Sequence, residues 1–221
     1  MKMNLNYLFR ISVVFTLTLC VYSCSSTPLN EDDPISYYKS ALDDVDSSRY
    51  VIALEKLRTI RHKFPYSSIS ADAQLKIADV YYLQEAFLEA AFAYKSFIEL
   101  HPKHKKTAYA FFRIGDSYFQ SSPTNIARDL TPAISALNAF GLFIEKFPHH
   151  ENSKLAHKKI SEIGTLLSEK ELYIADFYYN QDAYDAAKAR YKKLIKVFPN
   201  SPYVEEAREQ LESLSERGEK K

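Results

Sequence analysis

The sequence predicts an all-α fold in which helical hairpins stack into a solenoid, and three observations support this class. A phrase with Ala and aromatic residues at fixed spacing occurs four times, and each copy closes on a proline: Pro65, Pro102, Pro148 and Pro199. The chain has only 4 glycines and no tryptophan among its 221 residues. No run of alternating β-branched residues predicts a strand. Repetition at this scale is typical of units that bury their apolar faces against one another, and such arrays usually bind partners.

A common register links the repeated phrases. The residues that lie 5, 8, 12, 21 and 24 positions before Pro102 are Phe97, Tyr94, Ala90, Tyr81 and Ala78. The same offsets from Pro199 give Leu194, Tyr191, Ala187, Tyr178 and Ala175. This register resembles the tetratricopeptide repeat, in which small residues let two antiparallel helices approach and large residues fill the space between them. The resemblance implies a right-handed α-α superhelix of four to five tetratricopeptide-like helical hairpins.

The spacing of the prolines also shows where the array is irregular. The intervals are 37, 46 and 51 residues, whereas the repeat has a period of about 34 residues. In the third unit, the extra residues fall in positions 121–125, where turn chemistry ends a helix. In the last interval, residues 153–179 contain no proline and only Gly164 as a breaker. We therefore expect one long helix over residues 151–180.

Proline-containing dipeptides mark three expected helix starts. Asp33-Pro34, Thr131-Pro132 and Ser201-Pro202 each place a capping side chain before a proline at the first helical position. The expected organisation is a signal peptide (1–23), a lipidated tether (24–33), N-terminal repeats on the substrate-signal side (34–120), C-terminal repeats with the long helix and a capping helix (121–217), and a tail (218–221).

The first 23 residues are typical of a secretory signal peptide. Lys2 and Arg10 supply positive charge, residues 11–21 are apolar, and no acid occurs before Glu31. The apolar run is too short to span a bilayer. Val21-Tyr22-Ser23-Cys24 resembles a bacterial lipobox, which implies cleavage before Cys24 and lipidation of that cysteine. The alternative is an ordinary cleaved leader that contains a small buried cysteine.

Charge and motif content argue against nucleic-acid binding and catalysis. Removing Lys2 and Arg10 with the signal leaves 27 basic and 28 acidic side chains, so no basic excess is available to displace counterions from a nucleic acid. The six histidines lack the close spacing with carboxylates that metal sites show. The sequence contains no phosphate loop, nucleophile elbow or Cys–His pair. We expect no catalytic residue, cofactor or metal.

Side chains on the first helix of each unit are candidates for a peptide-binding groove. They fall on the face expected to line the inner curve of such a superhelix. Packing against the next repeat is the alternative role for at least half of them. The candidates are Tyr38, Leu42, Asp79, Tyr82, Tyr109, Phe112, Asp116 and Phe119.

An ordered set of segments resembles the BamD family, lipoproteins of the outer-membrane β-barrel assembly machinery. The resemblance covers residues 35–214 and includes Phe64-Pro65-Tyr66-Ser67, Ala78-Asp79-Val80-Tyr81-Tyr82, Arg113-Ile114-Gly115-Asp116-Ser117-Tyr118 and Arg128-Asp129-Leu130-Thr131-Pro132-Ala133. It implies a non-catalytic scaffold, lipid-anchored at the periplasmic face of the bacterial outer membrane. The implied partners are unfolded outer-membrane proteins, the periplasmic domains of the barrel-forming subunit and other assembly lipoproteins.

The family analogy also suggests where the barrel-forming subunit binds. The expected surface lies on the long helix and its successor, near Tyr173, Asp176, Tyr179 and Gln181. The alternative is another periplasmic tetratricopeptide lipoprotein that coordinates cell-envelope or peptidoglycan assembly. Such proteins usually carry an N-terminal coiled coil, and the sequence between Cys24 and Pro34 does not predict one. A cell-wall enzyme would need a further domain, and residues 205–221 are too few to form one.

Overall fold

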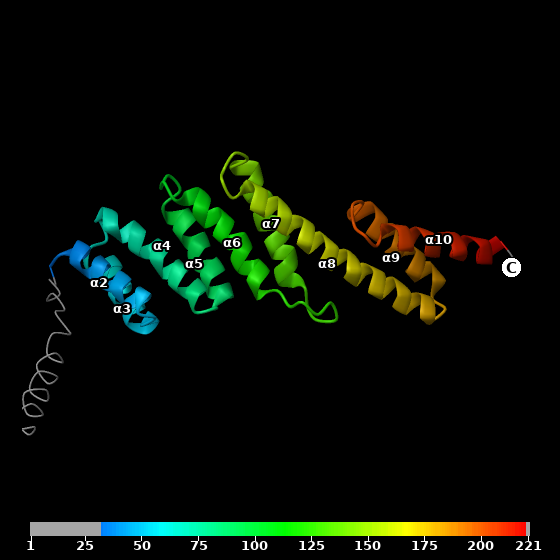
Figure 1. Cartoon of the computed structure of the whole chain (residues 1–221), viewed down its shortest axis with the longest axis horizontal. Helices are drawn as coiled ribbons and strands as arrows, with labels where there is room; N and C mark the ends of the chain where they lie inside the picture. Colours follow the sequence, from blue (N-terminus) through cyan, green and yellow to red (C-terminus); the bar gives the residue numbers. More distant parts are fainter. Residues whose placement is uncertain (1–31, 220–221) are drawn as a thin grey trace, which may run out of the picture.

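The computed structural model describes residues 32–219, and every regular element in that range is an α-helix. The helices form an elongated array in chain order (Figure 1). They are α2 (Pro34–Asp46), α3 (Tyr50–Lys63), α4 (Ser68–Leu83), α5 (Phe87–Leu100), α6 (Thr107–Ser121), α7 (Thr131–Lys146), α8 (Ser153–Asn180), α9 (Tyr184–Val197) and α10 (Val204–Glu219). The expected signal peptide, Cys24 and the last two residues of the tail lie outside the described residues.

The helices pair as the sequence predicted. Consecutive helices pack as hairpins α2–α3, α4–α5, α6–α7 and α8–α9, and α10 packs on α9. The described part of the chain therefore has four hairpins and a closing helix, and the predicted all-α array of tetratricopeptide-like hairpins is confirmed.

Small residues and rings alternate at the contact between the two helices of a hairpin. Tyr94 is fully buried in a cluster that contains Ala78 and Ala90, and Tyr191 is equally buried in a cluster that contains Ala175 and Ala187. In the third hairpin the small residue is Gly115, where an added Cβ would lie 2.7–2.9 Å from the ring of Phe140. Glycine is needed there because the ring already occupies the space of a methyl group.

The long helix α8 belongs to two cores. Ala156 and Ile163 are buried in the cluster formed with α6 and α7, whereas Leu172 and Ala175 are buried in the cluster formed with α9 and α10. Figure 1 shows α8 running from α7 to the C-terminal helices as one continuous rod. The helix occupies the segment that we expected to be long, and it joins the two halves of the array.

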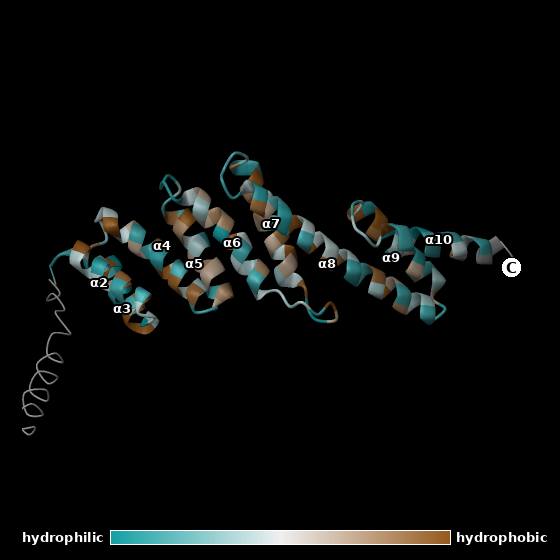
Figure 2. Cartoon of the chain, viewed as in Figure 1, coloured by the Kyte–Doolittle hydropathy of each residue, from teal (hydrophilic) through white to brown (hydrophobic). Residues whose placement is uncertain are grey.

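The closing helix α10 differs in composition from the helices inside the array. Figure 2 shows it largely in hydrophilic colours. Four exposed glutamates follow one side of it at helical spacing: Glu205, Glu209, Glu212 and Glu216. A polar outer face at the end of a solenoid keeps that end soluble.

Of the three expected helix starts, Asp33-Pro34 is confirmed, Thr131-Pro132 is confirmed in position but not in its cap, and Ser201-Pro202 is wrong. Asp33 caps α2, because its carboxylate accepts hydrogen bonds from the amides of Ile35 (3.0 Å) and Ser36 (3.2 Å). Thr131 does not cap α7. It is the first residue of that helix, and its amide instead donates to Asp129 at 3.0 Å.

Ser201 does not cap α10 at Pro202 either. Its hydroxyl accepts from the amide of Tyr203 at 3.1 Å, and the helix begins at Val204. In both cases, a short polar side chain bonds to the backbone two residues later, which forms a turn before the helix starts.

Candidate functional site

Five side chains from three helices surround the guanidinium group of Arg113 and form a network of hydrogen bonds with it and with one another. We call this set the Arg113 cluster, and its members are Asp79 and Tyr82 on α4, Tyr94 on α5, and Tyr109, Arg113 and Asp116 on α6. The repeat register brings them together, because α4 and α6 are the first helices of neighbouring hairpins and α5 lies between them.

Arg113 is a largely buried cation, with 18% of its side chain exposed. Its Nη1 donates to Oδ2 of Asp116 at 2.9 Å, and its Nε donates to the Tyr94 hydroxyl at 3.3 Å. The guanidinium carbon lies 3.5 Å from the centre of the Tyr82 ring, and the Tyr82 hydroxyl donates to the same oxygen of Asp116 at 2.9 Å. The carboxylate, the hydroxyl and the ring together compensate the guanidinium for the hydration that it loses.

Asp79 is the second acceptor of the cluster. Its Oδ1 accepts from the hydroxyls of Tyr94 (2.7 Å) and Tyr109 (2.9 Å), and its Oδ2 lies 3.0 Å from Nζ of Lys76. Burial, followed by the charge of Asp79, raises the pKa of Tyr109 to about 12. The same two causes raise the pKa of Tyr94. Both tyrosines are therefore protonated hydrogen-bond donors at neutral pH.

A cation at the position of Arg113 recurs along the array. Eleven residues after each of the first three repeat prolines, the chain carries a Lys or Arg that pairs with an acid three residues later. The pairs, which we call the cation row, are Lys76–Asp79 (3.0 Å), Arg113–Asp116 (2.9 Å) and Lys159–Glu162 (3.2 Å). After the fourth proline the corresponding residue is Gln210. Helices α4, α6 and α8 thus repeat one charged motif that α10 lacks.

Two members of the cation row also lie over aromatic rings of the preceding first helix. Arg113 stacks on Tyr82 as described above, and Nζ of Lys159 lies 3.9 Å from the centre of the Phe119 ring. Tyr82 and Phe119 occupy equivalent positions in their repeats, 17 residues after Pro65 and Pro102. Cation–aromatic stacking is therefore a repeated feature of this face.

Five of the eight predicted groove residues lie in or beside the Arg113 cluster: Tyr38, Asp79, Tyr82, Tyr109 and Asp116. Burial, with the charges of Asp72 and Asp79, raises the pKa of Tyr38 to about 12. Leu42 is half-buried on α2. Phe119 is half-buried against the core of α6, α7 and α8. Peptide binding by these residues stays a prediction.

The prediction for Phe112 is wrong, because this ring belongs to the core. It is 5% exposed, and its centre lies 5.6 Å from those of both Phe140 and Phe143. Phe112 follows its repeat proline by ten residues, as the buried Leu75 does in the preceding repeat. That position packs against the second helix of the same hairpin, so its side chain is not available to a ligand.

Sequence reasoning gave no role to Arg113, although it is the centre of the cluster. The sequence does contain a signal for it. Tyr109, Arg113 and Asp116 are spaced by four and three residues, so they share one side of a helix.

The predicted partner surface on α8 contains exposed residues and one engaged carboxylate. Tyr173 is 54% exposed, and Phe177, one turn later and not predicted, is 55% exposed. Asp176 accepts from the Tyr191 hydroxyl at 2.6 Å, so it serves the fold of the α8–α9 hairpin. Tyr179 packs edge-on against Tyr184, with 5.9 Å between ring centres. Gln181 is exposed at the end of the helix.

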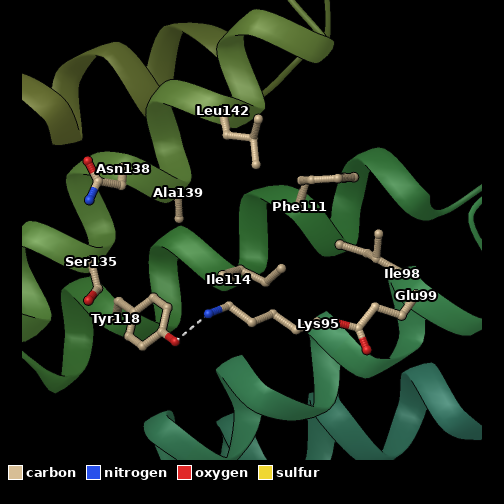
Figure 3. A pocket seen from close by; sticks show the side chains of 10 residues that line it. All are labelled: Lys95, Ile98, Glu99, Phe111, Ile114, Tyr118, Ser135, Asn138, Ala139 and Leu142. Carbon is tan, nitrogen blue, oxygen red and sulfur yellow. Dashed lines mark hydrogen bonds between the residues drawn. The ribbon is translucent and has the colours of Figure 1, made fainter.

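A groove opens on the other side of the array, between the second helices α5 and α7 and above α6. Its volume is about 390 Å³, and Figure 3 shows Ile114 and Tyr118 on its floor and Leu142 at its wall. Nζ of Lys95 donates to the Tyr118 hydroxyl at 2.8 Å. On α6, Ile114 and Tyr118 lie on the side opposite to Tyr109 and Arg113, because successive helical residues are rotated by about 100°. The groove and the Arg113 cluster therefore face in opposite directions.

An equivalent groove lies one repeat earlier, between α3 and α5 and above α4, with a volume of about 490 Å³. We call it the α3–α5 groove. Nη2 of Arg58 donates to the Tyr81 hydroxyl at 2.8 Å, as Lys95 does to Tyr118. A third hollow, of about 270 Å³, lies between α8 and the turn that joins α9 to α10.

Within residues 32–219, no three His, Cys, Asp or Glu side chains are grouped in a way that could hold a metal ion. In the same range, no helix combines the length and the apolarity needed to cross a bilayer.

A family model settles the relationship of the chain to known proteins. The model, YfiO, is described as an outer membrane lipoprotein and matches residues 30–220. The chain belongs to the YfiO family. The similarity to BamD proteins that the sequence predicted is confirmed by this match and by the relatives of the chain.

Two relatives of this chain are both named outer membrane protein assembly factor BamD. The protein from Vibrio cholerae is 26% identical over 210 residues, which cover 90% of this chain and 87% of the relative. The protein from Neisseria gonorrhoeae is 30% identical over 179 residues, which cover 77% of this chain and 67% of the relative. A solved tetratricopeptide repeat protein from Parabacteroides merdae aligns with a TM-score of 0.45 and 16% identity, over 86% of this chain and 76% of that protein.

Proposed function

We propose that this chain is a non-catalytic scaffold for outer-membrane protein assembly that binds unfolded barrel precursors and the barrel-forming subunit. The observation that carries the proposal is the family match over residues 30–220, together with relatives that are named outer membrane protein assembly factors. An array of helical hairpins suits this role, because it offers long faces to extended chains.

The N-terminal repeats are the proposed receptor for precursors. Tyr82 and Phe119 are half-buried rings at equivalent positions, and each lies under a cation of the cation row. Such a face suits a segment with aromatic side chains and backbone carbonyls, because rings stack and partly buried cations retain donors. Phe112 is excluded from this receptor by its burial.

The receptor is tested by crosslinking a precursor peptide to the full chain. Combined Tyr82→Ala and Phe119→Ala replacement should lower the crosslinking yield about tenfold without loss of helix content. Tyr66→Ala is the matched control, because this tyrosine is fully exposed in the turn after α3. Unchanged crosslinking in the double variant would exclude this face.

The barrel-forming subunit is proposed to bind the second half of α8. Tyr173 and Phe177 are exposed on adjacent turns, and exposed aromatic pairs are common anchors of interfaces. Copurification from solubilised outer membranes should recover the subunit with the wild-type chain and much less of it with Tyr173→Ala/Phe177→Ala. Leu155→Ala, which removes an exposed apolar residue from the first half of α8, is the control. Failure of the subunit to follow the wild-type chain would favour the alternative, a coordinator of cell-envelope or peptidoglycan assembly.

Attachment at the periplasmic face of the outer membrane is proposed to occur through an acylated Cys24. The support is the lipobox-like segment that precedes this residue and the lipoprotein description of the family. Cys24→Ser should release the chain from the membrane fraction. A Cys24→Ser chain that still sediments with outer membranes would contradict the anchor.

A further inference from the structure

The α3–α5 groove contains an exposed aromatic residue that the repeat does not need. Phe92 is 74% exposed on α5. It lies ten residues before its repeat proline, and the residues at that position in the other repeats are Glu55, Asn138 and Ala189. All four are exposed, so the position packs no core in any hairpin. A phenylalanine there has no structural explanation within the described chain, and exposed apolar side chains that are grouped mark interaction sites.

Phe92 is part of the wall that α5 contributes to the groove. Leu88, one turn earlier on α5, is 56% exposed and lines the same groove, and Ser96 lines it one turn later. Ile77 and the Tyr81 ring of α4 form the floor. From Leu88 to Ser96 the wall spans nine residues of α5, or about 12 Å at the rise of an α-helix. Its length suits two turns of an added helix that lies along α3 and α5.

The opposite wall carries two arginines. Arg58 and Arg61 lie one turn apart on α3, and both are exposed. Arg58 uses one of its five N–H donors on Tyr81. Arg61 forms no ion pair with any described residue. Glu89 is the acid of this groove, so its walls hold two guanidinium groups and one carboxylate. The excess of positive charge selects a partner with carboxylates.

The neighbouring groove shows that this combination is specific. In the α5–α7 groove of Figure 3, Asn138 replaces Phe92, and the charged wall holds one Lys95 and one Glu99. That groove has neither the exposed ring nor an excess of positive charge. The repeat therefore does not require an exposed ring or an excess of positive charge at this position, and of these two grooves the α3–α5 groove has both.

We propose that the α3–α5 groove docks an acidic amphipathic helix of a partner protein, with apolar residues against Leu88 and Phe92 and carboxylates against Arg58 and Arg61. A helix suits the groove because its apolar anchors recur every three to four residues, as Leu88 and Phe92 do. The site lies on the side of the array opposite to the Arg113 cluster, and the proposal does not depend on precursor binding there.

The test uses a photoreactive benzoyl-phenylalanine at position 92 of the full chain in its own cells, with the crosslinked segment mapped by mass spectrometry. The expected adduct lies in a partner segment with apolar residues at helical spacing and neighbouring Asp or Glu. Combined Arg58→Glu and Arg61→Glu should lower that adduct about tenfold. Lys95→Glu, the matched change in the other groove, should leave it unchanged, and circular dichroism checks that each variant folds.

Several results would overturn the proposal. The first is an adduct yield no higher than that of the same photoreactive residue at position 138. The second is an adduct that maps to lipid, to a second copy of this chain, or to a basic or extended segment of a partner. The third is an adduct whose yield is unchanged when Arg58 and Arg61 are both replaced by Glu. Precursor crosslinking at the proposed receptor, which contains Tyr82 and Phe119, is measured in the same cells. Loss of binding at one site is then distinguishable from loss of binding at the other.

Discussion

The Arg113 cluster and the corresponding region of the last hairpin each contain an equivalent Tyr–Asp hydrogen bond, but the side chains around that bond differ. Tyr94 donates to Asp79 at 2.7 Å in the second hairpin, and Tyr191 donates to Asp176 at 2.6 Å in the fourth. The tyrosines lie eight residues before their repeat prolines, and the aspartates 23 residues before. This Asp–Tyr bond joins the two helices of a hairpin in the second and fourth repeats, whereas Leu57 and Phe140 occupy the tyrosine position in the first and third.

The following helix makes the difference between the two regions. Helix α6 adds Tyr109 and Arg113, seven and eleven residues after Pro102, whereas α10 has Glu206 and Gln210 at the corresponding positions. The fourth hairpin folds without the cation and without the second tyrosine. The comparison teaches that a hairpin folds with the Asp–Tyr bond alone, whereas Tyr82, Tyr109 and Arg113 link α4 to α6 across neighbouring hairpins, which makes them better candidates for function than the Asp–Tyr bond.

The largest expected effect comes from removing the cation. Arg113→Ala should lower the free energy of unfolding by about 2–3 kcal/mol, because it leaves the buried Asp116 carboxylate without its ion pair. Gln210→Ala, at the corresponding position of α10, should change it by less than about 0.5 kcal/mol. Urea unfolding measures both. Equal effects would mean that the two regions do not differ in the way described.

The small residue of the first helix gives the next largest effect. Ala78 and Ala175 fill this position in the two compared hairpins, whereas Gly115 fills it in the hairpin between them. Gly115→Ala should cost about 1–2 kcal/mol, because the new methyl group meets the Phe140 ring. Gly164→Ala is the control, since no atom lies within 4 Å of its added Cβ, and it should stabilise α8 by up to about 1 kcal/mol. Thermal melts of both variants decide the matter, and a neutral Gly115→Ala would contradict the close contact.

Removal of the tyrosine hydroxyls probes how many donors each aspartate has. Tyr191→Phe should cost about 1 kcal/mol, because Asp176 loses its tyrosine donor. Tyr109→Phe should cost less, because Asp79 keeps Tyr94 and Lys76. Tyr94→Phe combined with Tyr109→Phe should then cost more than the sum of the single changes. Additive energies in the double-mutant cycle would show that the two donors do not substitute for one another.

The smallest effect appears only at alkaline pH. The folded pKa of Tyr109 is raised to about 12, above its ordinary value of 10, so the folded state favours the protonated hydroxyl. Its contribution to stability is complete below pH 10 and is lost as the pH rises toward 12. Tyr109→Phe should therefore flatten the decline of the unfolding free energy over that range. An unchanged slope in alkaline urea titrations would count against the raised pKa.

The sequence was sufficient to predict the architecture, because the residues that pack inside a hairpin recur at the same offsets from each repeat proline. The offsets of Ala78, Tyr94 and Phe97 from Pro102 specify which residues meet inside a hairpin, and the structure buries all three. The cap of α7 and the start of α10 were not predictable in this way. There, Asp129 and Ser201 bond to local backbone amides, and such short-range competition is not visible in a periodic pattern.

Most residues of the candidate site were predictable from the sequence, but the hydrogen bonds that join them were not. The sequence indicated Asp79, Tyr82, Tyr109 and Asp116, but their bonds to Arg113 depend on how α4, α5 and α6 face one another. Phe112 was misassigned because an aromatic residue on a first helix was read as groove-lining. Comparison with Leu75 at the same offset would have placed it in the core.

The uninterrupted α8 has a structural consequence. At 28 residues it is about 42 Å long, and its two ends are embedded in different cores. If the barrel-forming subunit binds near Tyr173 as proposed, the continuous helix connects that site to Lys159, whose ammonium lies over the Phe119 ring.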